Sequence, residues 1–165
     1  MRKVDPGLQP VLSAFAAGMR ALRVRYCLIG ALVPELLLDA PPPRRTNDVD
    51  AVVLVATLED FERLKGDLAP HGFRPTALPY RLEHAGGGRL DVLPYSQQLA
   101  PNDKLVLGGD LTFTVTGFDR IAAASLQVKM GSGDEIPLVR VPLYVLLKLV
   151  AFADRPRWKD PAGAV

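Results

Sequence analysis

The sequence predicts one α/β (α+β) domain, in which helices flank a mixed β-sheet. Segments with apolar residues at helical spacing alternate with short apolar runs rich in Val, Leu and Ile, which are typical of buried strands. The 165 residues are 48% hydrophobic, which suffices for one core that buries about 70% of the unfolded surface. With no repeat and no convincing linker, residues 1–165 are expected to form a single domain.

Four helices are expected, and each has an identifiable start or apolar face. Thr57 is a suitable N-cap for the third, and Pro34 and Pro142 fall where a first helical turn tolerates proline. The expected helices are 8–22, 31–38, 58–68 and 143–152.

The expected strands are shorter and are separated by glycine, proline and polar residues. They are 26–29, 48–55, 73–77, 80–84, 89–93, 111–115 and 136–141. Three glycines at 86–88 supply a turn, and the prolines of 39–45 require a loop. Residues 95–109 are expected to be rich in loops, and 121–130 fit neither pattern clearly.

Charge and cysteine content limit the classes of function. The net charge is +2 and the isoelectric point is about 8.8, which permits nucleic acid or nucleotide partners without requiring them. The lone Cys27 excludes an internal disulfide and suits a small buried side chain, so a reducing cytoplasm is the expected location. No apolar run reaches membrane-spanning length, so no membrane partner is expected.

Two aspartates stand at the start of the most apolar strand. Asp48 and Asp50 precede the run 52–55 and, by strand alternation, point to the same side roughly 7 Å apart. Like charges at that spacing repel each other and lose hydration. The pair therefore needs a compensating cation, or it faces open water as an ordinary strand end; the residues alone leave both alternatives open.

A third carboxylate, Asp91, lies inside another apolar strand, where aspartate is depleted. If the two strands are neighbours, the three carboxylates converge and suit a hard divalent cation such as Mg²⁺. Taken alone, Asp91 is better explained as a solvent-facing residue. Ile29, Gly30 and Ala31 add a strand, a tight turn and a helix start, an arrangement whose amide groups can hold a phosphate.

These residues resemble the DNA polymerase β-like nucleotidyltransferase superfamily. The resemblance rests on Gly30-Ala31, on Asp48-x-Asp50 and on the later Asp91. The form Arg-x-Thr-x-Asp-x-Asp, from Arg44, resembles the abortive-infection (AbiEii-type) toxin nucleotidyltransferases of toxin–antitoxin systems. The late segment LYVLLKLVAFADRPRWKDP is similar to that family's lysine-bearing helix and the basic turn after it.

The resemblance implies a nucleotidyltransferase-like fold, an NTP substrate and Mg²⁺ or Mn²⁺ as cofactor. Asp48, Asp50 and Asp91 would bind metal, and Asp91 would also assist deprotonation of the acceptor hydroxyl. Gly30 and Ala31 would form the turn that holds the triphosphate.

Four further positions carry implied nucleotide-binding roles. Lys148 would reach the phosphates, Asp160 would lie near the same pocket, and Arg44 and Thr46 would brace the acidic loop. The family has a C-terminal helical portion that would begin where this sequence stops, so the resemblance implies either a minimal member or a chain that lacks that portion.

Three functions follow as hypotheses. The first is a toxin nucleotidyltransferase that transfers NMP to an RNA or tRNA hydroxyl and has a cognate antitoxin protein. The second is a transferase acting on a small molecule such as an aminoglycoside, or on a protein. The third is a non-catalytic domain that binds a nucleotide or a partner, since Ala31 stands where the superfamily has Gly or Ser.

Overall fold

The computed structural model describes residues 4–38 and 46–154. Within these residues the helices form where the sequence predicts them. They are α1 (Gln9–Leu22), α2 (Leu32–Leu38), α3 (Leu58–Asp67) and α4 (Val141–Asp154), with short 3-10 turns at Ala69–His71 and Phe118–Arg120. The N-cap expected at Thr57 is present, because the Asp60 amide donates to Thr57 Oγ1 at 3.0 Å.

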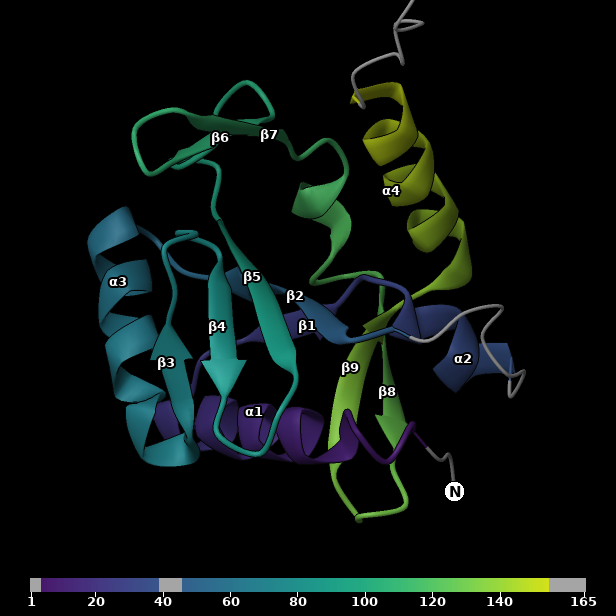
Figure 1. Cartoon of the computed structure of the whole chain (residues 1–165). Coiled ribbons are helices and arrows are strands. Elements are labelled where there is room, and N and C mark those ends of the chain that lie inside the picture. The colour runs from purple at the N-terminus through teal and green to yellow at the C-terminus, as the bar shows by residue number, and fades with distance from the viewer. Residues whose placement is uncertain (1–3, 39–45, 155–165) are drawn as a thin grey trace, which may run out of the picture.

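The described residues form one seven-stranded mixed sheet and a separate two-stranded hairpin, as Figure 1 shows. The sheet order is β3-β4-β5-β2-β1-β9-β8, with β2 parallel to β5 and β1 parallel to β9. Its strands are β1 (Tyr26–Leu28), β2 (Asp48–Leu54), β3 (Phe73–Pro75), β4 (Arg81–His84), β5 (Arg89–Tyr95), β8 (Ser125–Lys129) and β9 (Glu135–Val139). The hairpin pairs β6 (Lys104–Leu107) with β7 (Leu111–Thr114).

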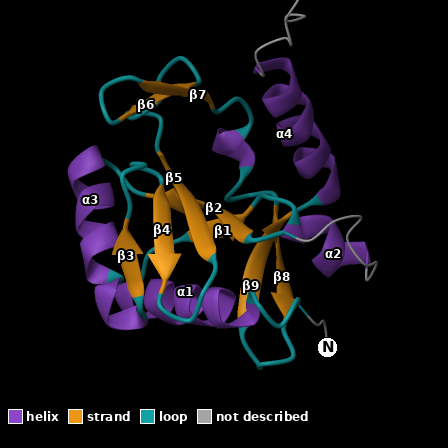
Figure 2. Cartoon of the chain, viewed as in Figure 1, coloured by secondary structure: helices purple, strands orange, loops and turns teal. Residues whose placement is uncertain are grey.

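The core lies between the sheet and the helices. In β2, Val52 and Val53 are fully buried, as expected for a strand covered on both faces. Helix α1 packs across the sheet through Phe15, whose ring lies 4.9 Å from that of Tyr26 and 6.4 Å from that of Phe73. Figure 2 shows α1 running across the strands and the hairpin standing apart from the sheet. The predicted mixed sheet with flanking helices is thus confirmed.

Two segments differ from the sequence-based expectation. Residues 95–109 contain β6, although they were expected to form loops: Leu105 and Leu107 alternate with exposed residues and are buried against the core. The ambiguous segment 121–130 contains β8, which pairs with β9. The expected loop at 39–45 lies outside the described residues. Among the helices that the structure describes, we find none with the length and apolarity to span a bilayer.

Candidate functional site

The acidic residues meet because β2 and β5 are adjacent parallel strands. In their register Asp50 lies opposite Asp91, and Asp48 lies opposite Arg89. Residues that face each other across parallel strands share a sheet face, so Asp50 and Asp91 point to the same side. The expected convergence of two separate acidic strands is therefore present.

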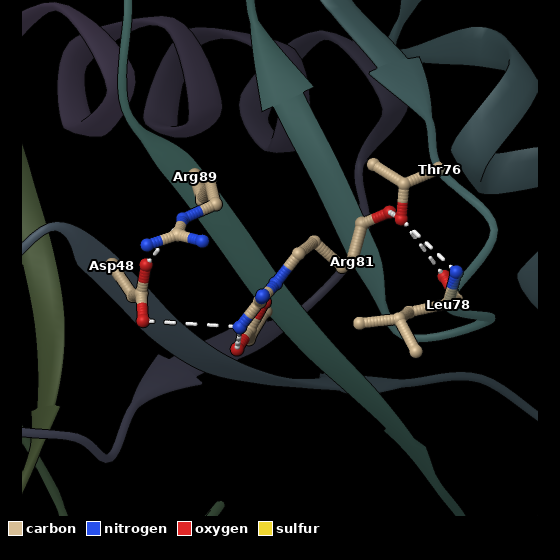
Figure 3. Close-up of polar contacts among 6 residues, drawn as sticks. Asp48, Thr76, Leu78, Arg81 and Arg89 are labelled. Carbon is tan, nitrogen blue, oxygen red and sulfur yellow. Dashed lines mark hydrogen bonds and ion pairs between the residues drawn. The ribbon is translucent and has the colours of Figure 1, made fainter.

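Arg81 of β4 binds Asp91 through two nitrogens on one edge of its guanidinium group. Arg81 Nε donates to Asp91 Oδ1 at 2.7 Å, and Arg81 Nη2 donates to Asp91 Oδ2 at 2.8 Å. Arg81 and Asp91 are also cross-strand partners, and Nη2 lies 3.8 Å from Asp48 Oδ2 (Figure 3). The interaction with Asp91 raises the pKa of Arg81, so this side chain stays cationic.

A second arginine neutralises Asp48. Arg89 Nε lies 2.9 Å from Asp48 Oδ1, and Figure 3 shows the Arg89 side chain directed at that carboxylate. The alignment does not make a hydrogen bond, and Asp48 Oδ1 is a buried oxygen without a hydrogen-bond donor. Asp48 Oδ1 is therefore held by an ion pair with Arg89, which any other cation would have to displace.

Asp50 is the most perturbed acid of the site. Burial, followed by the charges of Asp91 and Asp48, raises the pKa of Asp50 to about 6, while Lys148 and Arg81 act in the opposite direction. A carboxylate destabilised by burial and by neighbouring carboxylates gains most from a bound cation.

Gly30 lies against Asp50. A Cβ atom at Gly30 would stand 1.9 Å from Asp50 Oδ2, and the Asp50 carbonyl accepts a hydrogen bond from the Ile29 amide at 3.1 Å. Real Cβ atoms do not approach another heavy atom so closely, so this position requires glycine. The expected tight turn is thus present, and it fits around the acid.

A cavity of about 440 Å³ opens beside this turn, between the sheet, the segment that includes β7, and α4. Gly30, Asp50 and Lys148 line it together. Its wall also contains three threonines at alternating positions, Thr112, Thr114 and Thr116, and an apolar part that includes Phe113 and Leu147. A cavity with an apolar wall and a few convergent polar groups has the character of a small-molecule site.

The remaining predicted nucleotide-binding residues are spread more widely. Lys148 is exposed on α4, with Nζ 5.5 Å from the centre of the Tyr144 ring. Thr46 lines a different cavity, beside the 86–88 turn, and Ala31 is exposed. The structure therefore places Lys148 at the cavity of Asp50, whereas Thr46 lies at a different cavity. Arg44 and Asp160 lie outside the described residues.

The described residues contain no set of three or more His, Cys, Asp or Glu side chains arranged to hold one metal ion. The reason is visible at Asp91, because Arg81 occupies both of its oxygens. Asp48 is also paired with arginines, since Oδ1 lies 2.9 Å from Arg89 Nε and Oδ2 lies 3.8 Å from Arg81 Nη2. A cation at Asp48 and the buried Asp50 would therefore have to displace Arg89.

Sequence reasoning missed Arg81, Arg89 and the threonines of the cavity. Arg89 is the first residue of the strand that contains Asp91, and the threonines recur at every second residue, which is a strand signal. Arg81 gives no local signal, since its role depends on the pairing of β4 with β5.

No protein-family model and no curated protein sequence matches this chain. Solved structures do share its fold. An antigenic nucleotidyltransferase-like protein from Paracoccidioides brasiliensis superposes with a TM-score of 0.58 at 20% identity, covering 92% of this chain and 68% of the other. A candidate nucleotidyltransferase from Thermotoga maritima gives 0.54 at 15% identity, covering 93% and 92%.

The antibiotic-resistance factor ANT(2″)-Ia is a further structural neighbour. Its solution structure gives a TM-score of 0.51 at 13% identity, covering 89% of this chain and 75% of the other. Its crystal structure with adenylyl-2″-tobramycin gives 0.50 at 13% identity, covering 88% and 79%. These likenesses establish a nucleotidyltransferase-like fold; membership of the AbiEii-type family stays a prediction.

Proposed function

We propose that this protein is a divalent-metal-dependent nucleotidyltransferase, which transfers NMP from an NTP to an acceptor hydroxyl and releases pyrophosphate. The observation that carries the proposal is the meeting of Asp48 and Asp50 with Asp91 on neighbouring parallel strands, where Asp50 lines a cavity together with Gly30 and Lys148. The nucleotidyltransferase-like fold supports the same reaction class.

Asp48 and Asp50 would hold the cation, which would take the place of Arg89 at Asp48 Oδ1 and stabilise the buried carboxylate of Asp50. When bound, Mg²⁺ or Mn²⁺ supplies charge neutralisation for the triphosphate and polarises the oxygen bound to it. Asp50 would thereby regain the favourable charge environment that burial removes.

The other residues position the reactants. The Gly30 turn would hold the triphosphate at the cavity that it lines with Asp50, and the ammonium group of Lys148 would supply positive charge at the same cavity. Arg81 fixes the orientation of Asp91, which would stand beside the acceptor hydroxyl. Orientation and charge compensation would supply most of the rate enhancement, as is general for phosphoryl transfer.

The acceptor that we favour is a hydroxyl of RNA or tRNA, in the context of a toxin–antitoxin pair. This follows from the resemblance of the motif around Thr46 to the AbiEii-type toxins. A small-molecule acceptor is the second candidate, since ANT(2″)-Ia, whose crystal structure contains adenylyl-2″-tobramycin, shares the fold. A protein hydroxyl belongs to this second class.

A non-catalytic domain is the third candidate, and two observations favour it. Arg81 occupies both oxygens of Asp91, and Ala31 lacks the hydroxyl or close approach of the superfamily turn. Such a domain would bind NTP without turnover.

The test is to incubate the protein with each radiolabelled NTP, Mg²⁺ and total RNA, or with an aminoglycoside. Labelled RNA is expected, with pyrophosphate released in equal amount. An Asp48→Ala, Asp50→Ala double variant should lose transfer completely, and the exposed acids Asp110 and Asp119, replaced in the same way, are the matched control. Label on aminoglycoside or protein would select the second candidate, and thermal stabilisation by NTP without pyrophosphate release would select the third.

A further inference from the structure

A second cavity lies on the face of the sheet opposite to the acidic residues. The ring of Tyr26 in β1 packs against Phe15 of α1, so Tyr26 points to the face that α1 covers. Its cross-strand partner Val53 shares that face, and Asp50, an odd number of residues away in β2, points to the other one. The second cavity has a volume of about 450 Å³, includes Tyr26 in its wall and shares no residue with the cavity of Asp50.

Three exposed arginines line this second cavity, which we call the arginine cavity. Arg20 belongs to the last turn of α1, and Arg23 and Arg25 belong to the segment between α1 and β1. Arg20 forms an ion pair with Asp134 at 3.1 Å. No acidic side chain of the described residues forms an ion pair with Arg23 or Arg25. These two guanidinium groups therefore keep their charge available to a ligand.

The arginine cavity has an excess of positive charge. One of its wall residues, Glu135, is acidic, and Asp134 stands beside it as the partner of Arg20. Glu135 is itself the cross-strand partner of Lys129 in the pairing of β8 with β9. The two carboxylates thus leave part of the positive charge uncompensated, and an anion is the ligand that this charge favours.

Arg23 has a backbone conformation that favours glycine. It ends α1 with φ at 56° and ψ at 36°, and its amide donates to the Arg20 carbonyl at 3.2 Å. Helices often end on a left-handed glycine, because the Cβ atom of other L-residues meets the next carbonyl oxygen there. Strained residues of this kind cluster at ligand sites. The strain at Arg23 accompanies a guanidinium group that the turn adds to the cavity wall.

The rest of the wall suits the organic part of a small ligand. Polar and apolar side chains alternate around it: Tyr26, Ser125 and Gln127 are polar, and Met19, Leu54 and Ile121 are apolar. The volume falls in the range of small-molecule sites. Guanidinium groups bind phosphate oxygens through paired N–H groups, which gives arginine its preference for phosphate.

From this geometry we propose that the arginine cavity binds a phosphate ester. Arg23 and Arg25 hold the phosphate oxygens, and the wall around Tyr26 contacts the organic group of the ester. The phosphate belongs to a free ester or to a strand of RNA, which present the same chemistry to the arginines. Because this cavity and the acidic residues lie on opposite faces of the sheet, the proposal does not depend on the proposed function.

The experiment follows the phosphorus NMR signal of phenyl phosphate as the full chain is added in EDTA. The wild-type protein is expected to bind this ester. Arg23→Gly and Arg25→Gln should each weaken binding about tenfold, since each removes hydrogen bonds to a charged group. Arg23→Gly should also raise the midpoint of urea unfolding, because glycine adopts the left-handed conformation without strain. Loss of the ligand is thereby separated from loss of the fold.

Two control variants should bind phenyl phosphate as the wild type does. Arg74→Gln removes the same charge from β3, which lies at the other edge of the sheet from β8. The Asp48→Ala, Asp50→Ala double variant alters the acidic residues and leaves the arginine cavity intact. A short single-stranded RNA distinguishes the two sources of phosphate. RNA binding at least about tenfold tighter than that of phenyl phosphate assigns the nucleic-acid backbone, and equal or weaker binding assigns a free ester.

Four outcomes would overturn the proposal. They are no binding to the wild-type chain, unchanged binding by folded Arg23→Gly and Arg25→Gln variants, an equal loss in Arg74→Gln, and a loss in the double variant, which would place the phosphate at the acidic residues. A wild-type chain that binds phenyl phosphate through Arg23 and Arg25 but transfers no NMP would refute only the proposed reaction. Transfer of NMP without phosphate binding at these arginines would refute only the present proposal.

Discussion

The backbone of Gly30 packs directly against the side-chain carboxylate of Asp50. A Cβ atom built on Gly30 would lie 1.9 Å from Asp50 Oδ2 and 2.5 Å from both Asp50 Cβ and Cγ. Ile29, the residue before Gly30, donates its amide to the Asp50 carbonyl at 3.1 Å. The turn and the acid are therefore one structural unit, and neither can be altered without moving the other.

Gly30→Ala should destabilise the protein by at least about 2 kcal/mol, since the added methyl group must displace Asp50 or the turn. The free energy of unfolding in urea measures the effect. Gly66→Ala is the control: Gly66 lies in α3 with no atom within 4 Å of an added Cβ, and the change should stabilise by about 0.5–1 kcal/mol. Equal stability of Gly30→Ala and wild type would show that the turn is not packed as described.

Asp50→Asn should stabilise the metal-free protein at neutral pH. The pKa of Asp50 rises from 3.8 to about 6 on folding, so its favourable contribution is complete below pH 3.8 and is lost as the pH rises through 6. Asparagine does not ionise, so the variant does not suffer that loss. Its free energy of unfolding should exceed that of the wild type by about 2–3 kcal/mol at pH 8, and the difference should vanish near pH 3.5.

Urea unfolding in EDTA at a series of pH values measures this difference. Asp110→Asn, at an exposed acid between β6 and β7, is the control and should change the stability by less than about 0.5 kcal/mol. A difference between Asp50→Asn and wild type that does not vary with pH would contradict the burial of an ionisable Asp50.

Lys148→Met should weaken NTP binding about tenfold, because it removes a positive charge from the cavity of Asp50. Lys148 is exposed, so the stability should stay within about 0.5 kcal/mol of wild type. Titration with a fluorescent NTP analogue measures the affinity. Lys129→Met, at an exposed position on β8, should leave the affinity for the NTP analogue unaltered. A similar loss of affinity in both variants would show that the net charge of the protein, and not the position of Lys148, causes the effect.

The thiol of Cys27 should resist alkylation in the folded protein. Cys27 is 1% exposed, and burial raises its pKa to about 12, so the reactive thiolate is scarce at pH 8. The reaction of Cys27 with a chromogenic disulfide should be slow in buffer. It should be fast in about 6 M guanidinium chloride, which unfolds the protein. Rapid labelling of the native protein would place the thiol at the surface.

Thr57→Ala should cost about 1 kcal/mol of stability, since the Asp60 amide loses the oxygen that caps α3. Thr57→Ser keeps the hydroxyl and should recover most of the loss. Thermal unfolding of both variants separates the cap from the packing of the threonine methyl group. A stable Thr57→Ala variant would mean that water caps the helix equally well.

The sequence by itself determined the local features of this protein. The helical spacing of apolar residues, the cap at Thr57 and the glycines at 86–88 each act over a few residues, so their structures could be predicted from the residues concerned. The alternation that sends Asp48 and Asp50 to one side of β2 is equally local.

The tertiary structure decided which residues meet. Strand β6 was not predicted, because the burial of Leu105 and Leu107 depends on the core against which they pack. Arg81 reaches Asp91 only because β4 pairs with β5 in one register, and a shift of one residue would turn its side chain to the other face. Strand order and register follow from contacts across the whole chain, and for that reason the acids could be found in the sequence while the arginines that neutralise them could not.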